Sequence, residues 1–195
     1  MATHALPAAP VQRPRVLVVG TAFLSAASFM VFAAMLGVYL LERSSVLASA
    51  PKWLPEGATI PLQQPNTMFI TLILSVVTMQ WAVYAISRND RVNAYLALGM
   101  TFLFGVATIT MTTYLWHLMK LDVSSGPQAV LIYTITGAHV AMIVLAMVFL
   151  ALMAFRALGG QFNALQHDGL TAAALFWYTM VAVYALIWII IYVTK

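Results

Sequence analysis

Two histidines, His117 and His139, are the ionisable side chains that lie within long apolar stretches of this chain. His139 occurs in the sequence TGAHVAM, and Met142 follows it at the i+3 position, on the same face of a helix. Imidazole and thioether ligands suit Cu(I), so one interpretation is a copper site at His139 and Met142. The chain has twelve methionines, however, and methionine commonly fills gaps in apolar packing. We therefore favour a neutral His139 hydrogen-bonded to another helix.

Thiols and charged side chains, which catalysis often uses, are absent from these stretches. The chain has no cysteine, which excludes thiolate nucleophiles, disulfides and thiolate-bound metal centres. Intramembrane Asp, Glu, Lys and Arg usually mark proton relays and ion pathways, and the apolar stretches contain none of them. His117 ends the third stretch and is expected at a different depth from His139, too far away to share a metal ion or a haem. The sequence therefore predicts no active site or cofactor in this chain.

The elements that position these residues are predicted to be five transmembrane helices. The chain has 195 residues, of which 63% are hydrophobic and only 7% are charged, too few charges for a water-soluble domain. The charged residues cluster and leave five uncharged stretches, each with the roughly 20 residues that a helix needs to cross the hydrocarbon. The alternating pattern of a β-barrel is absent. We predict an all-α integral membrane protein with a polar tail (1–15) and a single five-helix domain (16–195), with helices near 16–41, 67–87, 93–119, 128–158 and 169–193.

Polar side chains recur at helical spacing on two of these helices. Such stripes could line a water path, but in membrane proteins they more often pack against a neighbouring helix or subunit. Asn66 is expected to cap the second helix. The stripe on the second helix consists of Thr67, Thr71, Ser75 and Thr78, and that on the third consists of Thr101, Thr108 and Thr112.

Pairs of small residues four positions apart are expected to permit close approach between helices. The five tryptophans include residues suited to anchoring in the membrane interface. The small pairs are Ala22–Ala26, Ala33–Gly37 and Gly137–Ala141.

The basic residues are scattered, which argues against a nucleic-acid-binding surface. Five of them are expected at the end of the bundle that carries the N-terminus, and four at the other end, where acidic residues accompany them. The positive-inside rule then favours a cytoplasmic N-terminus. The first group is Arg13, Arg15, Arg88, Arg91 and Arg156, and the second is Arg43, Lys52, Lys120 and Lys195.

Several segments together resemble subunit III of the haem–copper terminal oxidases, in a compact five-helix form without the family's first two helices. The stretch that ends in Tyr39 and Arg43 is similar to the first helix of this form, and PNTMFITLILSVVTMQWA resembles its Pro-Asn-Thr-led helix. TGAHVAM resembles its Thr-Gly-x-His helix, and FWYTMVAVYALIWIIIY its aromatic-rich last helix. The resemblance covers nearly the whole chain, with the segments in order.

The chain departs from the family at positions where the family usually carries buried ionisable residues. Ser28 stands in place of a glutamate of the first helix, whereas His139 is retained. A family role in proton uptake is therefore not carried over to this chain. The other departures are Thr112 and Leu115 in the Gln-x-x-Glu pattern, Met142 in place of a second histidine, and Tyr178 and Val181 in place of a His and an Asp.

The resemblance implies a non-catalytic subunit of a haem–copper respiratory oxidase in the bacterial cytoplasmic membrane. Such a subunit packs on the catalytic subunit I and other oxidase subunits, binds phospholipid, and supports stability and oxygen access. Haem and copper are then expected in a partner subunit and not in this chain. The residues expected to have structural or interface roles are His139, Arg43, Asn66, Thr71, Ser75 and Ser28.

Two alternatives remain open from the sequence. The chain could be an accessory five-helix subunit of a different complex, such as a nitric oxide reductase or a membrane monooxygenase, which fits the loss of the acidic residues. A stand-alone transporter is a second alternative. It is disfavoured because the membrane stretches lack charges and no internal repeat is visible.

Overall fold

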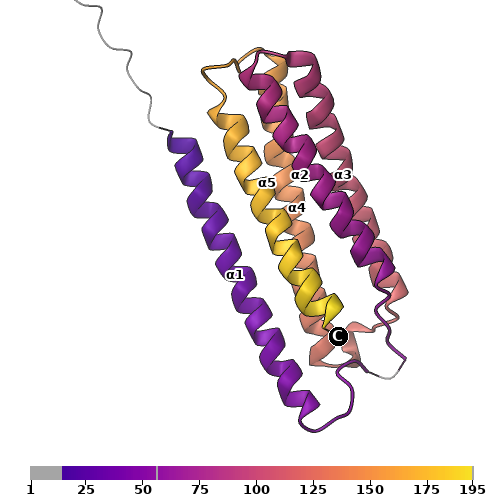
Figure 1. Ribbon diagram of the computed structural model, residues 1–195. Helices are drawn as coiled ribbons and strands as arrows, with labels where there is room; N and C mark the ends of the chain where they lie inside the picture. Colours follow the sequence, from indigo (N-terminus) through magenta and orange to yellow (C-terminus); the bar gives the residue numbers. More distant parts are fainter. Residues whose placement is uncertain (1–14, 56, 195) are drawn as a thin grey trace, which may run out of the picture.

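The computed structural model describes residues 15–55 and 57–194, which form an elongated helical bundle (Figure 1). Each of the five main helices, α5 together with its extension η2, is long and apolar enough to cross a membrane, which confirms the predicted fold class. The predicted N-terminal tail lies outside the described residues, except for Arg15. The helices are α1 (Val16–Leu47), α2 (Gln63–Ser87), α3 (Arg91–Leu118), a short 3-10 helix η1 (Val123–Ser125), α4 (Pro127–Leu158), α5 (Asp168–Ile187) and the π-helical η2 (Trp188–Val193).

Two helix ends differ from the prediction. Helix α1 continues past Leu41 to Leu47, since no proline or glycine interrupts the chain before Pro51. Helix α2 begins at Gln63 with Leu62 at the N-cap, so the prediction that Asn66 caps this helix is wrong. Pro65 is compatible with the earlier start, because the first turn of a helix has no partner for its backbone N–H groups.

Helix α3 has a side-chain cap at its N-terminus. The Asp90 carboxylate accepts hydrogen bonds from the Asn93 backbone nitrogen at 3.2 Å and from its side-chain nitrogen at 2.6 Å. These bonds favour the ionised form and lower the pKa of Asp90. Asn89, just before the cap, has a φ of 58° and turns the chain between α2 and α3. The α2–α3 connection is therefore a tight hairpin that places the two helices side by side.

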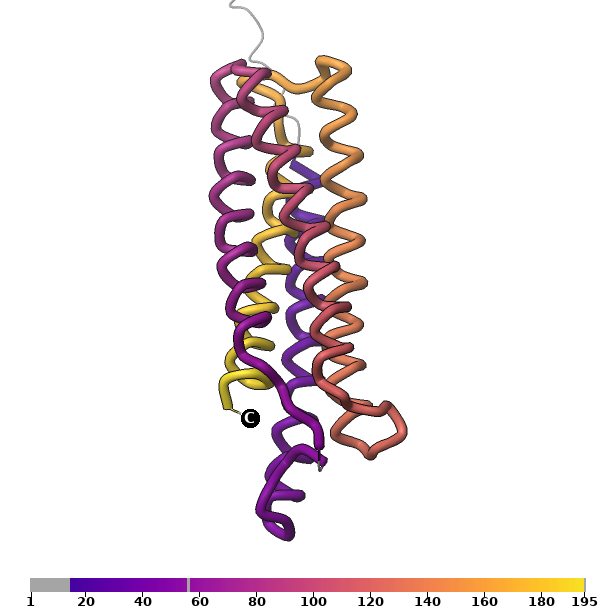
Figure 2. The backbone as a smooth tube through the Cα atoms, turned by 90° about the vertical axis from the view of Figure 1, so that its right-hand side faces the viewer, coloured from indigo at the N-terminus to yellow at the C-terminus, as the bar shows by residue number. Residues whose placement is uncertain are grey.

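Helix α5 lies between α1 and α2 with α4 behind it in the view of Figure 1, and all three pack against it (Figures 1 and 2). Its fully or almost fully buried residues, Trp177, Met180, Tyr184, Ile187 and Ile191, recur at helical spacing. Helix α1 packs mainly on α5 and α4, and most of its large apolar side chains are exposed. Outward apolar side chains are expected where the surrounding solvent is lipid, because they cost nothing there.

The closest helix contacts involve glycines that the small-residue pattern did not include. A Cβ atom at Gly105 would lie 2.9 Å from the Met147 sulfur and 3.1 Å from the Trp177 ring. By contrast, the small pairs selected from the sequence point away from the tight contacts: Ala22, Ala26, Ala33 and Ala141 are exposed, and added Cβ atoms at Gly37 and Gly137 would meet no atom within 4 Å.

Candidate interior site and its hydrogen bonds

His139 lies where α4 meets α5 and α1, and only 3% of its surface is exposed. Its Nε2 atom is 3.2 Å from the carbonyl oxygen of Met180 on α5. A carbonyl can only accept a hydrogen bond, so Nε2 carries the proton and donates it. Phe32 of α1 and Tyr184 of α5 flank the imidazole, with ring centroids at 6.2 and 5.3 Å. The imidazole therefore connects three helices.

A groove between α1 and α4 lies beside this junction. Its volume is about 360 Å³, and Ser28, Phe32, Met142 and Leu145 are among its lining residues. The Ser28 hydroxyl donates to the carbonyl oxygen of Leu24 at 2.9 Å, within its own helix. The groove therefore presents an almost entirely apolar surface, which suits a hydrocarbon chain or a small apolar molecule better than an ion.

Ser75 and Thr71 belong to the same predicted stripe on α2 but have different surroundings. Ser75 is fully buried, and its Oγ accepts a hydrogen bond from Trp177 Nε1 at 2.9 Å while donating to the Leu72 carbonyl oxygen at 2.6 Å. Thr71 is half-buried and donates to the carbonyl oxygen of Thr67 at 2.8 Å. Ser75 thus links α2 to α5, whereas the hydrogen bond of Thr71 stays within α2.

The Ser/Thr stripes of α2 and α3 meet inside the bundle. The hydroxyl oxygens of Thr78 and Thr101 are 2.8 Å apart, and both residues are buried. Further along α3, the Thr112 hydroxyl donates to the Thr108 carbonyl oxygen at 2.8 Å and lies 3.4 Å from the sulfur of Met68 on α2. The two stripes therefore form part of the contact between α2 and α3.

Arg43 and Asn66 both bond to the last turns of the chain that the structure describes. The Arg43 guanidinium donates to the side-chain and carbonyl oxygens of Thr194. Asn66 Oδ1 accepts a hydrogen bond from Trp188 Nε1 at 2.8 Å, and the Trp188 ring stacks on Phe69 with centroids 4.9 Å apart. At this end of the bundle, α1 and α2 are each tied to the α5–η2 segment.

Two more bonds between helices involve residues that the sequence did not single out as pairs. The Tyr184 hydroxyl donates to the Pro65 carbonyl oxygen at 3.0 Å, and the Tyr178 hydroxyl donates to Gln80 Oε1 at 2.7 Å. The sequence shows that the last helix is rich in aromatic residues. The residues of α2 that bond to Tyr178 and Tyr184 follow no pattern that the sequence would reveal. Within residues 15–55 and 57–194, no three His, Asp or Glu side chains lie close enough to hold a metal ion together.

Comparison with known proteins places this arrangement in a family context. The sequence model of the family described as cytochrome c oxidase subunit III matches residues 10–195. A protein named "Probable cytochrome c oxidase subunit 3" from Rickettsia conorii is 29% identical over 135 residues, 68% of this chain and 48% of the relative. "Cytochrome c oxidase subunit 3" from Cyprinus carpio is 26% identical over 163 residues, 80% of this chain and 62% of the relative.

The similarity covers more of this chain than of the relatives. The chain spans about half the length of the Rickettsia relatives and less than two thirds of the fish proteins. The family match nevertheless includes all five helices that the structure describes.

Proposed function

Because this chain belongs to the cytochrome c oxidase subunit III family, we propose that it is a non-catalytic subunit of a haem–copper respiratory oxidase. The family match over residues 10–195 is the observation that carries the proposal. The chain packs on the catalytic subunit, where the haem and copper of such an oxidase reside, and contacts other oxidase subunits. It contributes no reacting group of its own.

Hydrogen bonds between elements of the bundle support a structural role for the selected polar residues. Four of them bond to α5, to η2 or to Thr194 just after η2, and therefore hold this last segment in register with its neighbours; they are His139, Ser75, Arg43 and Asn66. Thr71 satisfies its hydroxyl within α2 and contributes little to holding the helices together.

The α1–α4 groove supports a role in lipid binding and oxygen access. Its apolar lining, with the Ser28 hydroxyl already satisfied, matches an acyl chain of a phospholipid. Oxygen is a small apolar molecule and partitions into the same surroundings, so the groove offers it a place to bind on the subunit.

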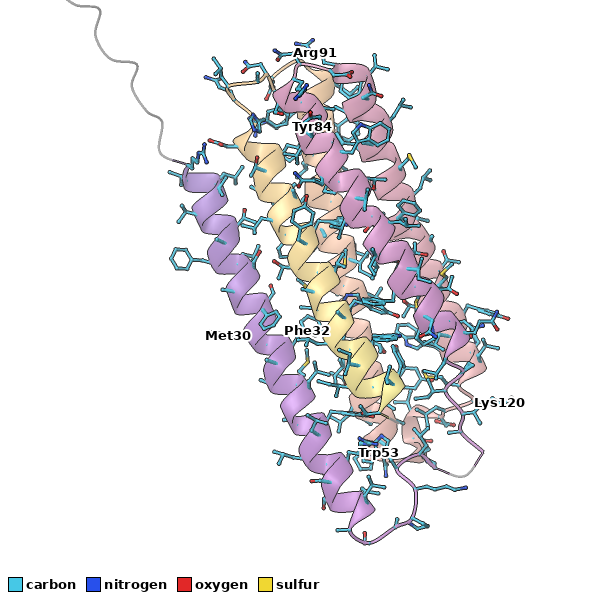
Figure 3. The ribbon with its side chains drawn as sticks, viewed as in Figure 1. Met30, Phe32, Trp53, Tyr84, Arg91 and Lys120 are labelled. Atoms are coloured by element: carbon cyan, nitrogen blue, oxygen red, sulfur yellow. The ribbon has the colours of Figure 1, made fainter. Side chains whose placement is uncertain are left out.

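The charge distribution supports a cytoplasmic N-terminus in a bacterial inner membrane. The end of the bundle where α1 begins carries Arg15, Arg88, Arg91 and Arg156 with Asp90 and Asp168, whereas the opposite end carries Arg43, Lys52 and Lys120 with Glu42 and Asp122. Figure 3 shows Arg91 and Lys120 at these opposite ends. The excess of arginine at the first end agrees with the positive-inside rule.

Deleting the chain from its host tests the non-catalytic role. We expect the membranes to retain the haem bands of the oxidase in a reduced-minus-oxidised spectrum, while the oxidase loses activity faster during sustained turnover. Expression of the intact chain should restore the lifetime of the activity. An unchanged oxidase, with loss of nitric oxide reduction or of a membrane monooxygenase activity, would place the chain in one of those complexes instead.

A further inference from the structure

Gln80 and Tyr178 form a polar pair on the outside of the bundle. Gln80 is exposed on α2 and Tyr178 is half-buried on α5, and these two helices run side by side (Figure 1). The 2.7 Å hydrogen bond from the tyrosine hydroxyl uses the Gln80 oxygen. The amide nitrogen of Gln80 has no partner in the part of the chain that the structure describes. If the oxygen and nitrogen of the Gln80 amide exchange positions, the Tyr178 hydroxyl still bonds to only one of these two atoms.

The pair lies within the candidate membrane spans of α2 and α5, away from the helix ends. Gln80 is seven residues before the end of α2 at Ser87, about 10 Å along the helix axis. Tyr178 is ten residues after the start of α5 at Asp168, about 15 Å along its axis. Hydrocarbon tails offer no hydrogen-bond acceptor, so an exposed amide at this depth is expected to face protein.

The side chains around Gln80 on the same face suit a protein contact. Val77 and Tyr84 are 61% and 52% exposed, and they flank Gln80 at helical spacing on α2. The guanidinium of Arg88 lies over the Tyr84 ring, 4.6 Å from its centroid. On α5, the exposed Ala182 follows Tyr178 by one turn and leaves room for a neighbouring backbone. Tyrosine and arginine are enriched at protein interfaces, and small residues at contacts between membrane helices.

We propose that this face, formed by Val77, Gln80, Tyr84, Tyr178 and Ala182, docks a transmembrane helix of the oxidase's catalytic subunit. The docked helix presents a side-chain oxygen that accepts a hydrogen bond from the Gln80 amide nitrogen. This inference rests on the proposed function, because it takes the catalytic subunit as the partner.

Charge favours this occupant over a second copy of the chain. Two copies related by a two-fold axis along the membrane normal would bring the same face together at the same depth. Each Arg88 would then approach the Arg88 of the other copy, with like charges opposed at the contact. A helix of a different protein can place a neutral or acidic group there.

Photocrosslinking in intact membranes tests the position of this face. A photoreactive amino acid replaces Val77 in one variant and Leu103 in the control; Leu103 is 66% exposed and lies on the α3–α4 side of the bundle. We expect an adduct with the catalytic subunit, identified by mass spectrometry, from position 77 and not from position 103. An adduct with a second copy of this chain, or with lipid alone, from position 77 would overturn the docking face.

The crosslinking result also separates this inference from the proposed function. Capture of the catalytic subunit from position 103 but not from position 77 would refute the docking face and leave the subunit assignment intact. If neither position captures any oxidase subunit and the chain does not co-purify with the oxidase, the proposed function itself fails.

The Gln80→Leu variant tests the hydrogen bond. We expect the Kd for the catalytic subunit in detergent to rise by up to about tenfold, since an interhelical bond at the contact is lost. Thr110→Val is the matched control, because Thr110 is exposed on α3 and its hydroxyl is satisfied by the Val106 carbonyl oxygen at 3.0 Å. Equal Kd values for the two variants would show that Gln80 makes no bond to the partner.

Discussion

The Ser75 hydroxyl takes part in two hydrogen bonds at a position with no access to solvent. It donates to the Leu72 carbonyl oxygen and accepts from Trp177 Nε1, the polar group of a fully buried side chain. Without the Ser75 hydroxyl, the Trp177 indole N–H would be left without its partner. Such pairs are costly to break in an apolar interior, because an unsatisfied buried donor has neither water nor protein to bond to.

Replacing Ser75 by alanine should therefore destabilise the bundle. We expect a loss of about 1–3 kcal/mol in the free energy of unfolding, because the indole N–H of Trp177 stays buried without an acceptor. Unfolding in a detergent titration, followed by tryptophan fluorescence, measures this loss. Thr71→Val is the control, since Thr71 bonds only within α2, and its change should stay within about 0.5 kcal/mol. Equal losses in both variants would contradict the role given to Ser75.

His139→Leu should have a modest and purely structural effect. The substitution removes the hydrogen bond to Met180, which is expected to cost about 1 kcal/mol. The complex should keep its haem bands in a reduced-minus-oxidised spectrum and should still turn over. Loss of haem, or of all turnover while the subunits remain assembled, would mean that His139 has a chemical task that the hydrogen bond to Met180 does not explain.

The sequence predicts which polar residues bond to another helix better than it predicts their partners. The position of His139 within an apolar stretch already indicates a hydrogen bond to another helix, and its spacing from Met142 indicates a shared face. The acceptor at Met180 is a backbone carbonyl, and every residue carries one, so composition cannot identify it. Asn66 shows the same limit: its side chain bonds to Trp188, 122 positions away in the sequence, and does not cap α2.

At the scale of the helices, α3 depends on one glycine for its contact with α4 and α5. A side chain at Gly105 would collide with Met147 and with the rigid ring of Trp177. Gly99, on the same helix, has no atom within 4 Å of the place where its Cβ would be. The two glycines look alike in the sequence, but only one of them lies at a helix contact.

Substitutions at Gly105 and Gly99 give a direct test of helix packing. Gly105→Val should destabilise the bundle by about 2 kcal/mol, the usual scale of overpacking in a tight interior. Gly99→Val should change stability by less than about 0.5 kcal/mol, since valine is the better helix former and meets no neighbour. Thermal unfolding of both variants in the same detergent checks this, and an equal shift in their melting temperatures would rule out the contact.

The extent of the helices follows from the spacing of charges, whereas their ends depend on local geometry. Uncharged stretches about as long as the membrane is thick identify five spans without reference to packing. Helix α1 nevertheless continues through Glu42 and Arg43, because an interfacial helix can keep its hydrogen bonds beyond the hydrocarbon. Helix α2 begins before Pro65, at a place where the sequence suggests a loop. Neither end is set by hydropathy.

At the scale of the whole molecule, the bundle is built around α5, and α1 lies at its edge with most of its apolar surface exposed. Helices α2 and α4 each have a hydrogen bond to α5, and α1 has one to Thr194, the residue that follows η2. The polar side chains inside the bundle therefore bond to other parts of the same chain, and contacts with other molecules are left to the outer surface. Membership of the subunit III family identifies those molecules, by our proposal, as the other subunits of an oxidase and the lipids between them.

Purification of the chain from its native membrane in a mild detergent tests this account most directly. The sample is analysed by a reduced-minus-oxidised visible spectrum, with its partners identified by mass spectrometry. We predict the bands of a haem–copper oxidase together with its catalytic subunit in equal amount to this chain. A stable complex with other membrane proteins and no such oxidase would contradict the account, and the function of the chain would then lie in that other complex.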